Sequence, residues 1–314
     1  MASQLRNLLA VATLGATLVA FSGCAVPSGD ASSSSTPTAD ATSAAAALVP
    51  DEIKERGYVI VATDAQWGAP TNYHPDGDST QWAGVEHDLL EAMEPILGVE
   101  FRQEDAAFTS IITGVTSGRY DLGVSGFQDT VERQEVVDMV DYMRGGGNTL
   151  IVKVGNPEDI HDYADMCGRT MGVVSGSIDE TFWSDYSASD CDADEQIEIL
   201  TFADRPAALL ALDSDRIVAA TGSGAFSLNL TYNWDGAQSA NQGKFEVLLD
   251  EIEYGISELP AAFVAPKGDD SIRDAVLAAL QELMDSGEFY TIMDEWHYPD
   301  EWLWDSPQLN AATE

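Results

Sequence analysis

From residue 57 onward, short runs of β-branched and other apolar residues alternate with longer amphipathic runs. The first half of this pattern consists of YVIVAT at 58–63, an amphipathic run at 86–97, VEFRQE at 99–104, a second amphipathic run at 108–118, and YDLGVSG at 120–126. Continuous apolar strands bounded by glycine and charged residues are typical of a sheet that helices cover on both faces. The order of the runs therefore predicts an α/β fold.

The pattern begins again with NTLIVK at 148–153. The further elements expected are strands at 169–176, 198–200, 216–221 and 263–267, and helices from Ile178, at 205–212 and at 271–287. Ser271 is the expected N-cap of the last helix, and Gly287 its expected end. With 314 residues and 45% apolar content, the chain is long enough for two modest domains, each with its own core.

The charge of the chain excludes several classes of partner. Lys and Arg total 14 against 54 Asp and Glu, so no basic face is available to bind nucleic acid or anionic lipid, and the acidic surface is interpreted as a means of solubility. The four histidines are scattered without the spacing of metal ligands, at 74, 87, 161 and 297. We therefore expect no metal and no cofactor, and nothing in the chain resembles a phosphate-binding loop.

The N-terminus has the features of an export signal. Arg6 precedes an apolar run at 8–21 that is too short to span a membrane convincingly, so 1–23 is interpreted as a signal peptide. The run ends in FSGC, which resembles a bacterial lipobox and makes Cys24 the lipid-modified first residue of the mature chain. The alternative is an ordinary signal peptide with an incidental cysteine. Residues 24–51, rich in Ser, Thr and Ala, are expected to form a flexible tether to the outer face of the membrane.

The other two cysteines, Cys167 and Cys191, would then lie in an oxidising compartment. A disulfide between them would close a loop of about 25 residues and stabilise the fold by about 3 kcal/mol. Two buried free thiols are the alternative.

The sequence of the folded part resembles the family 3 solute-binding proteins of ABC importers, the polar amino acid type, over about residues 52 to 310. The pieces that carry the resemblance are VIVATDAQW, GVEHDLLEAM, FTSIITGVTSGRYDLGVSGFQDTVERQEVVDMVDY, CGRTMGVVSGSIDE and AVLAALQELMDSGEFYTIMDEWHY. The resemblance implies a two-lobed periplasmic-binding-protein type II (Venus-flytrap) fold with two chain crossovers. Lobe 1 would comprise 52–148 and 258–314, the latter with a C-terminal tail, and lobe 2 would comprise 149–257. A ligand would bind in the cleft between the lobes.

Arg133 is the first candidate for the binding site. Ligands of open α/β sheets bind beyond the carboxyl ends of strands, where helix N-termini favour anions. Asp129, with Glu132 three residues on, resembles a capping box that starts a helix at about Thr130 and places Arg133 near its first turn. A guanidinium there can bind a carboxylate bidentately. The further donors expected nearby come from Ser125, Gly126, Gln128 and Thr130.

By resemblance to the family motif S-G-x-x-x-T-x-x-R, Arg133 holds the α-carboxylate of the ligand. The alternative is a surface ion pair with Glu132 or Glu135. The resemblance also assigns Trp67 and Phe108 to the walls of the site, where similar proteins place the ligand side chain between two rings. Otherwise both rings belong to the core. Asp64 would face the far end of the ligand and permits a cationic or amide side chain.

Lobe 2 departs from the family pattern at two places. GSIDE at 176–180 aligns with G-T-T-x-E, so Ser177 keeps one hydroxyl and Ile178 removes the other. Ser223 stands where the family has an aspartate that binds the α-ammonium, and its loss would weaken binding about ten- to a hundredfold. Either a nearby acid substitutes, or the ligand lacks a free α-ammonium, as in an N-modified amino acid, an opine-like compound or another small carboxylate.

The leading hypothesis is a monomeric, non-catalytic importer component that delivers a small carboxylate-bearing solute to a membrane permease powered by an ATPase. A ligand-sensing subunit for a membrane receptor would use the same residues. A third hypothesis is a dehydratase-like enzyme on the same fold, in which Asp64 or Glu86 acts as general acid or base.

Overall fold

The computed structural model of the protein describes residues 43–145, 148–223, 243–248, 259–268 and 270–313, together with 225, 228 and 229. These residues belong to one compact unit, Ala39–Glu314. The predicted signal peptide, Cys24 and residues 24–42 of the predicted tether lie outside the described part.

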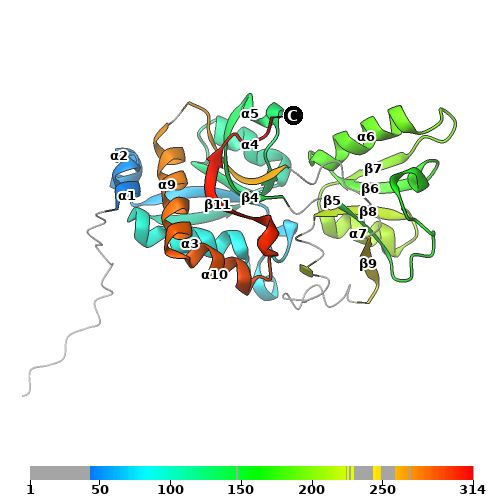
Figure 1. Cartoon of the computed structure of the whole chain (residues 1–314), viewed down its shortest axis with the longest axis horizontal. Coiled ribbons are helices and arrows are strands. Elements are labelled where there is room, and N and C mark those ends of the chain that lie inside the picture. Colours follow the sequence, from blue (N-terminus) through cyan, green and yellow to red (C-terminus); the bar gives the residue numbers. More distant parts are fainter. Residues whose placement is uncertain are drawn as a thin grey trace, which may run out of the picture. The chain divides into compact units, whose positions relative to one another are not determined.

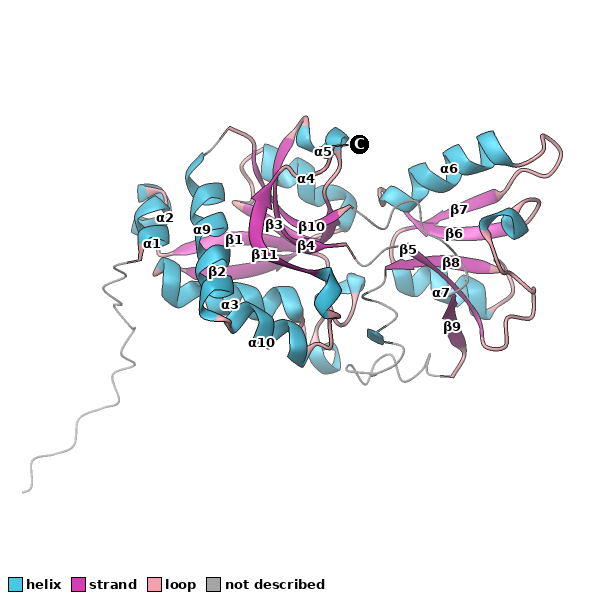
Figure 2. Ribbon diagram, in the orientation of Figure 1, coloured by secondary structure: helices cyan, strands magenta, loops and turns pink. Residues whose placement is uncertain are grey.

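The first sheet has six strands, in the order β11-β4-β10-β3-β1-β2 (Figures 1 and 2). Their bounds are β1 Tyr58–Thr63, β2 Glu100–Asp105, β3 Leu122–Gln128, β4 Val137–Arg144, β10 Pro260–Pro266 and β11 Leu303–Leu309. Strand β1 pairs in parallel with β2 and β3, whereas β10 pairs antiparallel with β3 and β4, and β11 antiparallel with β4. The sheet is therefore mixed, and two of its strands, β10 and β11, come from the last part of the chain.

Helices cover both faces of this sheet. One face carries α3 Val85–Leu97, α9 Asp270–Ser286 and α10 Glu288–Glu295, and the other carries α4 Phe108–Thr116. In α3, the side chains of Val85, Leu89 and Met93 are fully buried, at the four-residue spacing that places them on one side of a helix. Gly287 follows α9 in the left-handed conformation, so the predicted end of that helix is confirmed. Lobe 1 denotes this sheet with its helices.

The second sheet has five strands, in the order β7-β6-β8-β5-β9. Their bounds are β5 Asn148–Lys153, β6 Thr170–Val174, β7 Glu198–Phe202, β8 Ala219–Ser223 and β9 Phe245–Leu248. Two helices, α6 Ile178–Asp190 and α7 Arg205–Asp213, lie on opposite sides of the strands in Figure 2 and close two separate apolar clusters. Lobe 2 denotes this sheet with its helices.

The chain passes from one sheet to the other twice, between β4 and β5 and again between β9 and β10. This topology confirms the predicted α/β, two-lobed type II fold with two crossovers. The predicted boundary at 148 and 149 falls on the first residues of β5, just after the first connection. The predicted boundary at 257 and 258 lies outside the described residues, as do 146–147 and 249–256.

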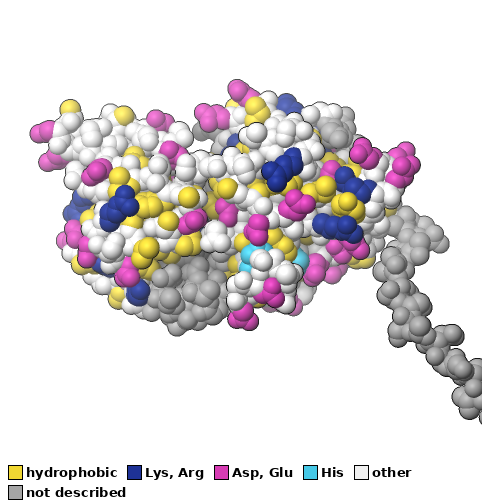
Figure 3. All heavy atoms as spheres, turned by 180° about the vertical axis from the view of Figure 1, so that it is seen from behind, with side chains coloured by type: hydrophobic (Ala, Val, Ile, Leu, Met, Phe, Trp, Pro, Cys, Tyr) yellow, Lys and Arg dark blue, Asp and Glu magenta, His cyan; other side chains and the backbone are white. Residues whose placement is uncertain are grey.

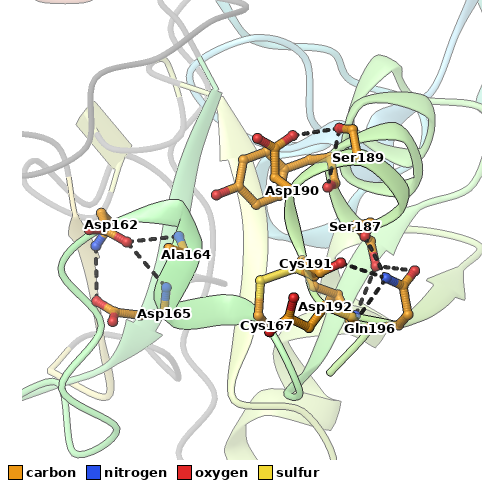
Figure 4. Close-up of a disulfide and its surroundings, with 12 residues drawn as sticks. Asp162, Ala164, Asp165, Cys167, Ser187, Ser189, Asp190, Cys191, Asp192 and Gln196 are labelled. Carbon is orange, nitrogen blue, oxygen red and sulfur yellow. Dashed lines mark hydrogen bonds between the residues drawn. A yellow bond between two sulfur atoms is a disulfide. The ribbon is translucent and has the colours of Figure 1, made fainter. Parts of the chain in front are cut away.

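The predicted disulfide between Cys167 and Cys191 is present, with Cα atoms 5.5 Å apart. It joins the chain just after the short helix η3 Tyr163–Met166 to the residue that follows α6 (Figure 4). Gln196 reinforces this corner, because its amide donates to the carbonyl oxygens of Ser187 and Cys191. The cross-link therefore fixes the C-terminal end of α6 to the body of lobe 2.

Three details of the sequence prediction are wrong. The expected tether ends earlier, because Ala44–Leu48 forms helix α1, which packs against α9, and Asp51–Arg56 forms α2. The run AAAAL forms a helix because alanine loses no side-chain entropy there, and Ala45 and Val49 are buried in the core of lobe 1. Helix α9 begins at Asp270, so Ser271 is not its N-cap.

The third error concerns strand ends. Strand β3 continues to Gln128 because the antiparallel partner β10 extends its ladder. Strand β8 starts at Ala219 rather than at 216, since a turn in which the amide of Arg216 donates to Ala211 follows α7. Strands β4, β9 and β11 and helix α10 are not among the predicted elements.

In the part of the chain that the structure describes, no helix is long and apolar enough to cross a membrane. Acidic side chains are scattered over the face shown in Figure 3, with Lys and Arg in small separate groups among them. The basic side chains form no continuous patch on this face.

Candidate functional site

The predicted site residues gather at the carboxyl ends of parallel strands in both lobes. On lobe 1, Asp64 and Trp67 follow β1, Ser125, Gly126 and Gln128 lie in β3, Thr130 and Arg133 follow it, and Phe108 begins α4. On lobe 2, Ser177 and Ile178 follow β6, and Ser223 ends β8. We call these two regions the lobe 1 edge and the lobe 2 edge. The side chain of Ser223 lies outside the described part of the structure.

The turn that carries Arg133 differs from the prediction in its cap. Thr130, not Asp129, is the N-cap of the short helix α5 Val131–Gln134, because its hydroxyl accepts a hydrogen bond of 3.2 Å from the amide of Arg133. Asp129 is fully buried and accepts from Gln134 Nε2 and from the amide of Ala312. Its carboxylate therefore ties the C-terminal tail to the turn instead of starting the helix.

The guanidinium of Arg133 lies between the two lobes. Its Nη1 donates to the carbonyl of Gln128 at 2.6 Å, and its Nη2 donates to the carbonyl of Gly176 on lobe 2 at 3.2 Å. A guanidinium has five N–H donors, so the group retains further donors for an acidic partner. Burial lowers the pKa of Arg133 to about 10, so it is charged at neutral pH.

The predicted alternative, an ion pair of Arg133 with Glu132 or Glu135, is not formed among the described residues. Instead the guanidinium lies 5.3 Å from the ring centre of Phe127 and 5.9 Å from that of Phe108. The rings limit access of water to one side of the charge, which strengthens its attraction for an anion.

The three aromatic rings of the lobe 1 edge form a continuous stack. Trp67 and Phe108 lie 4.7 Å apart between ring centres, and Phe108 and Phe127 lie 4.5 Å apart. The two rings contact each other directly, so no ligand side chain lies between them in this arrangement. Trp67 also packs directly on the backbone of Gly126, where a Cβ atom would lie 2.3 Å from the indole nitrogen.

Asp64 gives the site an acidic end. Its Oδ1 accepts from the amide of Gln66 and its Oδ2 from the amide of Phe108, both at 2.9 Å. Burial raises the pKa of Asp64, and the charges of Asp204 and Asp105 raise it further. The three acids belong to the lining of a cavity of about 270 Å³, whose wall consists of Asp64, Gln66, Asp105, Ala106, Ala107, Ala203 and Asp204. A positive group suits this cavity.

Glu86 stabilises the lobe 1 edge through the hydrogen bonds that it accepts. This fully buried carboxylate accepts from the amide of Gly126 at 3.0 Å, from the hydroxyl of Tyr142 at 2.9 Å, and from the amide of Asn72. Burial raises the pKa of Glu86 to about 7, and these donors limit the rise. These hydrogen bonds fix the backbone of Gly126, on which the ring of Trp67 packs.

Arg205 is a contact residue that sequence reasoning missed. It begins α7 on lobe 2, is 5% exposed, and donates through Nη1 to the carbonyl of Trp67 on lobe 1 at 2.8 Å. Its guanidinium lies 4.8 Å from the Trp67 ring centre, and burial lowers its pKa to about 10, with the charges of Asp179 and Asp64 opposing this. The signal that identified Arg133 also applies here, since Arg205 is a rare base in the first turn of a helix that follows a strand.

The lobe 2 edge faces a second cavity, of about 350 Å³. Lobe 1 contributes Thr130, Val131, Glu132 and Arg133 to its wall, lobe 2 contributes Gly176, Ser177, Ile178, Thr181 and Phe182, and Leu259 completes it. Glu180 orders the turn here, because its side chain accepts from the amide of Gly176 at 2.8 Å. Arg133 and the turn at Gly176 therefore share one cavity that both lobes line.

No group of three or more His, Cys, Asp or Glu within the described residues could hold a metal ion. The site is instead composed of guanidinium groups, buried carboxylates, hydroxyls and aromatic rings. Such a set can bind a small polar molecule that carries charges of both signs.

Comparisons with known proteins identify the family of this chain. The profile of the bacterial extracellular solute-binding proteins, family 3, matches residues 59–299. The arginine-binding protein ArgT of Corynebacterium glutamicum is 30% identical over 266 residues, which cover 84% of this chain and 82% of that protein.

Solved structures show the same fold. The amino acid ABC transporter substrate-binding protein AbpA from Streptococcus pneumoniae, bound to L-arginine, is 23% identical, with a TM-score of 0.67 and coverage of 79% of this chain and 97% of that one. An ancestral arginine-binding protein bound to arginine is 26% identical, with a TM-score of 0.65 and coverage of 77% and 99%. The chain thus belongs to the bacterial extracellular solute-binding proteins of family 3.

Proposed function

We propose that this protein binds a free amino acid with a cationic side chain, of which L-arginine is the model, as the solute-binding component of an ABC importer. The observation that carries the proposal is the guanidinium of Arg133, which is charged, lies between both lobes beside two rings, and retains donors after its two carbonyl bonds. A bidentate bond to the α-carboxylate would use those donors.

The cationic side chain is inferred from the acidic cavity. Phe108 connects the two ends of the site, because its ring lies near Arg133 while its amide donates to Asp64. An extended ligand with its carboxylate at Arg133 would therefore direct its far end toward Asp64, Asp105 and Asp204. The arginine-binding role of ArgT, the relative described above, supports this choice.

The other roles follow from the same proposal. Cys24 would carry the lipid that holds the protein to the outer face of the membrane, and a permease with its ATPase would receive the ligand. Binding without chemistry is favoured over the dehydratase-like alternative, since both oxygens of Asp64 and of Glu86 accept hydrogen bonds from protein donors. A receptor in place of the permease would leave the binding site the same.

Isothermal titration with L-arginine, L-citrulline and L-glutamine tests the proposal. We expect L-arginine to bind more tightly than its uncharged near-isostere L-citrulline, because only arginine places a cation in the acidic cavity. Arg133→Ala should weaken L-arginine at least about 100-fold, since it removes one partner of a buried charge pair.

Arg119→Ala is the matched control, because Arg119 lies on the exposed surface of the same lobe. Its affinity should equal that of the wild type. Undiminished binding by Arg133→Ala would refute the carboxylate role, and a preference for citrulline would refute the cationic side chain.

A further inference from the structure

Three buried oxygen atoms at the lobe 2 edge lack a well-formed hydrogen bond in the described structure, although two of them, both hydroxyl oxygens, lie near enough to act on the third, a carboxylate oxygen. They are the hydroxyl oxygens of Ser177 and Thr221 and Oδ1 of Asp179, and the three residues are 7%, 3% and 8% exposed, respectively. Buried polar atoms in proteins nearly always have partners. A group of three at one edge of a sheet therefore indicates a place for polar atoms from outside the chain.

Asp179 is the charged member of this group. It lies in the first turn of α6, and the charges of Arg205 and Arg133 and the nearby hydroxyls of Thr221 and Ser177 all favour its ionised form. Burial acts more strongly in the opposite direction, so the pKa of Asp179 is raised to about 6. The carboxylate is still mainly negative at neutral pH.

The acids that act on Arg133 differ in what they can still bind. Asp129 is occupied by Gln134 and Ala312 within lobe 1, and Glu132 is exposed. Asp179 acts on Arg133 from lobe 2, is buried, and has an oxygen without a well-formed hydrogen bond. Among the acids that raise the pKa of Arg133, it alone combines burial with a free acceptor in the described structure.

We infer that Asp179, with the hydroxyls of Thr221 and Ser177, binds the α-ammonium group of the amino acid whose carboxylate Arg133 holds. The inference rests on the proposed function. Carboxylate and ammonium are attached to the same carbon of an amino acid, so the acceptor for one has to lie close to the donor for the other. Three oxygens suit the three N–H donors of an ammonium group.

This assignment explains how the chain tolerates Ser223. The negative charge is supplied from the first turn of α6 instead of from the end of β8, where Ser223 lies. It also selects among ligands, because an N-acylated nitrogen is neutral and bulkier than the buried oxygens can accommodate. The ligand class is then the α-amino acids with a charged amino group, and N-acylated compounds are excluded.

Two probes that differ only in the ammonium group test the inference by isothermal titration. They are L-arginine and 5-guanidinopentanoic acid, which has the same carboxylate and guanidinium but no α-amino group. Asp179→Asn should weaken L-arginine about 10- to 100-fold, the effect of one charge-assisted hydrogen bond, and should change the affinity for 5-guanidinopentanoic acid less than about threefold.

Asp185→Asn, an exposed site on the same helix, is the control and should bind both probes as the wild type does. Urea unfolding without ligand confirms that the Asp179 variant is folded. Equal weakening of both probes would overturn the inference, because Asp179 would then act only by holding Arg205 or Arg133. If the wild type binds neither probe, the proposed function fails and this inference with it.

Discussion

The two edges of the site treat their buried polar groups in opposite ways. At the lobe 1 edge, Asp64, Glu86 and Asp129 each accept hydrogen bonds from protein donors. At the lobe 2 edge, Ser177, Asp179 and Thr221 each hold an oxygen without a well-formed hydrogen bond in the described structure. Lobe 1 is therefore a platform completed by the fold itself, whereas lobe 2 presents atoms that a ligand can complete.

This difference suits a protein that closes around its ligand. A satisfied edge keeps its shape when the site is open to water, so Arg133 and the ring stack remain oriented. The unsatisfied oxygens of the other edge gain partners only when the ligand and both lobes meet. Under the proposed function, part of the binding free energy would then be gained only when both lobes contact the ligand.

The largest effect that tests this comparison is expected for Glu86→Ala. The change leaves the donors of Gly126, Asn72 and Tyr142 buried without their acceptor, so the free energy of unfolding should fall by about 3–5 kcal/mol. Urea denaturation measures it. Glu91→Ala, exposed on the same helix, should stay within about 0.5 kcal/mol of the wild type. A similar loss in both variants would contradict a platform held by hydrogen bonds.

Gly126→Ala tests the close packing of the Trp67 ring on the backbone of Gly126. The new Cβ would approach the indole nitrogen to 2.3 Å, and the backbone has a φ of 60°, which an L-residue rarely adopts. Strain and overpacking together should lower the free energy of unfolding by about 2–4 kcal/mol. Gly118→Ala has a φ of 74° with open space around the new atom, so it reports the backbone strain alone, about 1 kcal/mol. Equal losses would show that Trp67 moves freely.

Asp141→Asn tests the exception at the lobe 1 edge, where Oδ1 of Asp141 lacks a well-formed bond next to Asp129. Burial and the charge of Asp129 raise the pKa of Asp141 to about 8. The folded state therefore holds a proton that the unfolded state releases near pH 4, and stability falls as the pH rises from about 4 to about 8.

Asparagine can accept from the amide of Ala311 and donate to Asp129 at any pH. At pH 8 the Asp141→Asn variant should be about 1–3 kcal/mol more stable than the wild type, and near pH 4 the difference should vanish, as measured by urea unfolding. Asp138→Asn on the same strand is expected to have the opposite sign at pH 8. Burial opposes ionisation of Asp138, but the hydrogen bond from Asn310 and the ion pair with Arg273 together lower its pKa. An Asp141→Asn variant that is no more stable than the wild type at pH 8 would contradict the raised pKa of Asp141.

The smallest effect is expected when the same Thr→Val substitution is made once at each edge. Thr63→Val on lobe 1 removes a hydroxyl that accepts from Gln103 at 3.1 Å and should cost about 1 kcal/mol. Thr221→Val on lobe 2 removes a hydroxyl that has only a poorly formed contact with Asp179 and should change the free energy of unfolding by less than about 0.5 kcal/mol. Both are measured without ligand. Equal costs would remove the distinction between the two edges.

Much of the architecture could be predicted because it depends on local pattern. The predicted helix starts at Ile178, at 205 and at Phe108 agree with α6, α7 and α4, since helix starts follow from neighbouring residues. Strand β4 escaped prediction although seven of its eight residues are buried, because its run mixes acids with apolar residues. Asp141 is buried there only because Asp129 and the C-terminal tail lie beside it.

The sequence by itself determined the α/β order, the disulfide and the position of Arg133 at the end of a strand, because periodicity and motif spacing act over short stretches of chain. Only the tertiary structure decided that Arg205 reaches Trp67, 138 residues away, and that the rings stack on one another. It also decided that Asp179 stands among Arg133, Arg205 and Thr221. Those contacts depend on how two separately formed sheets meet, and no local pattern encodes that geometry.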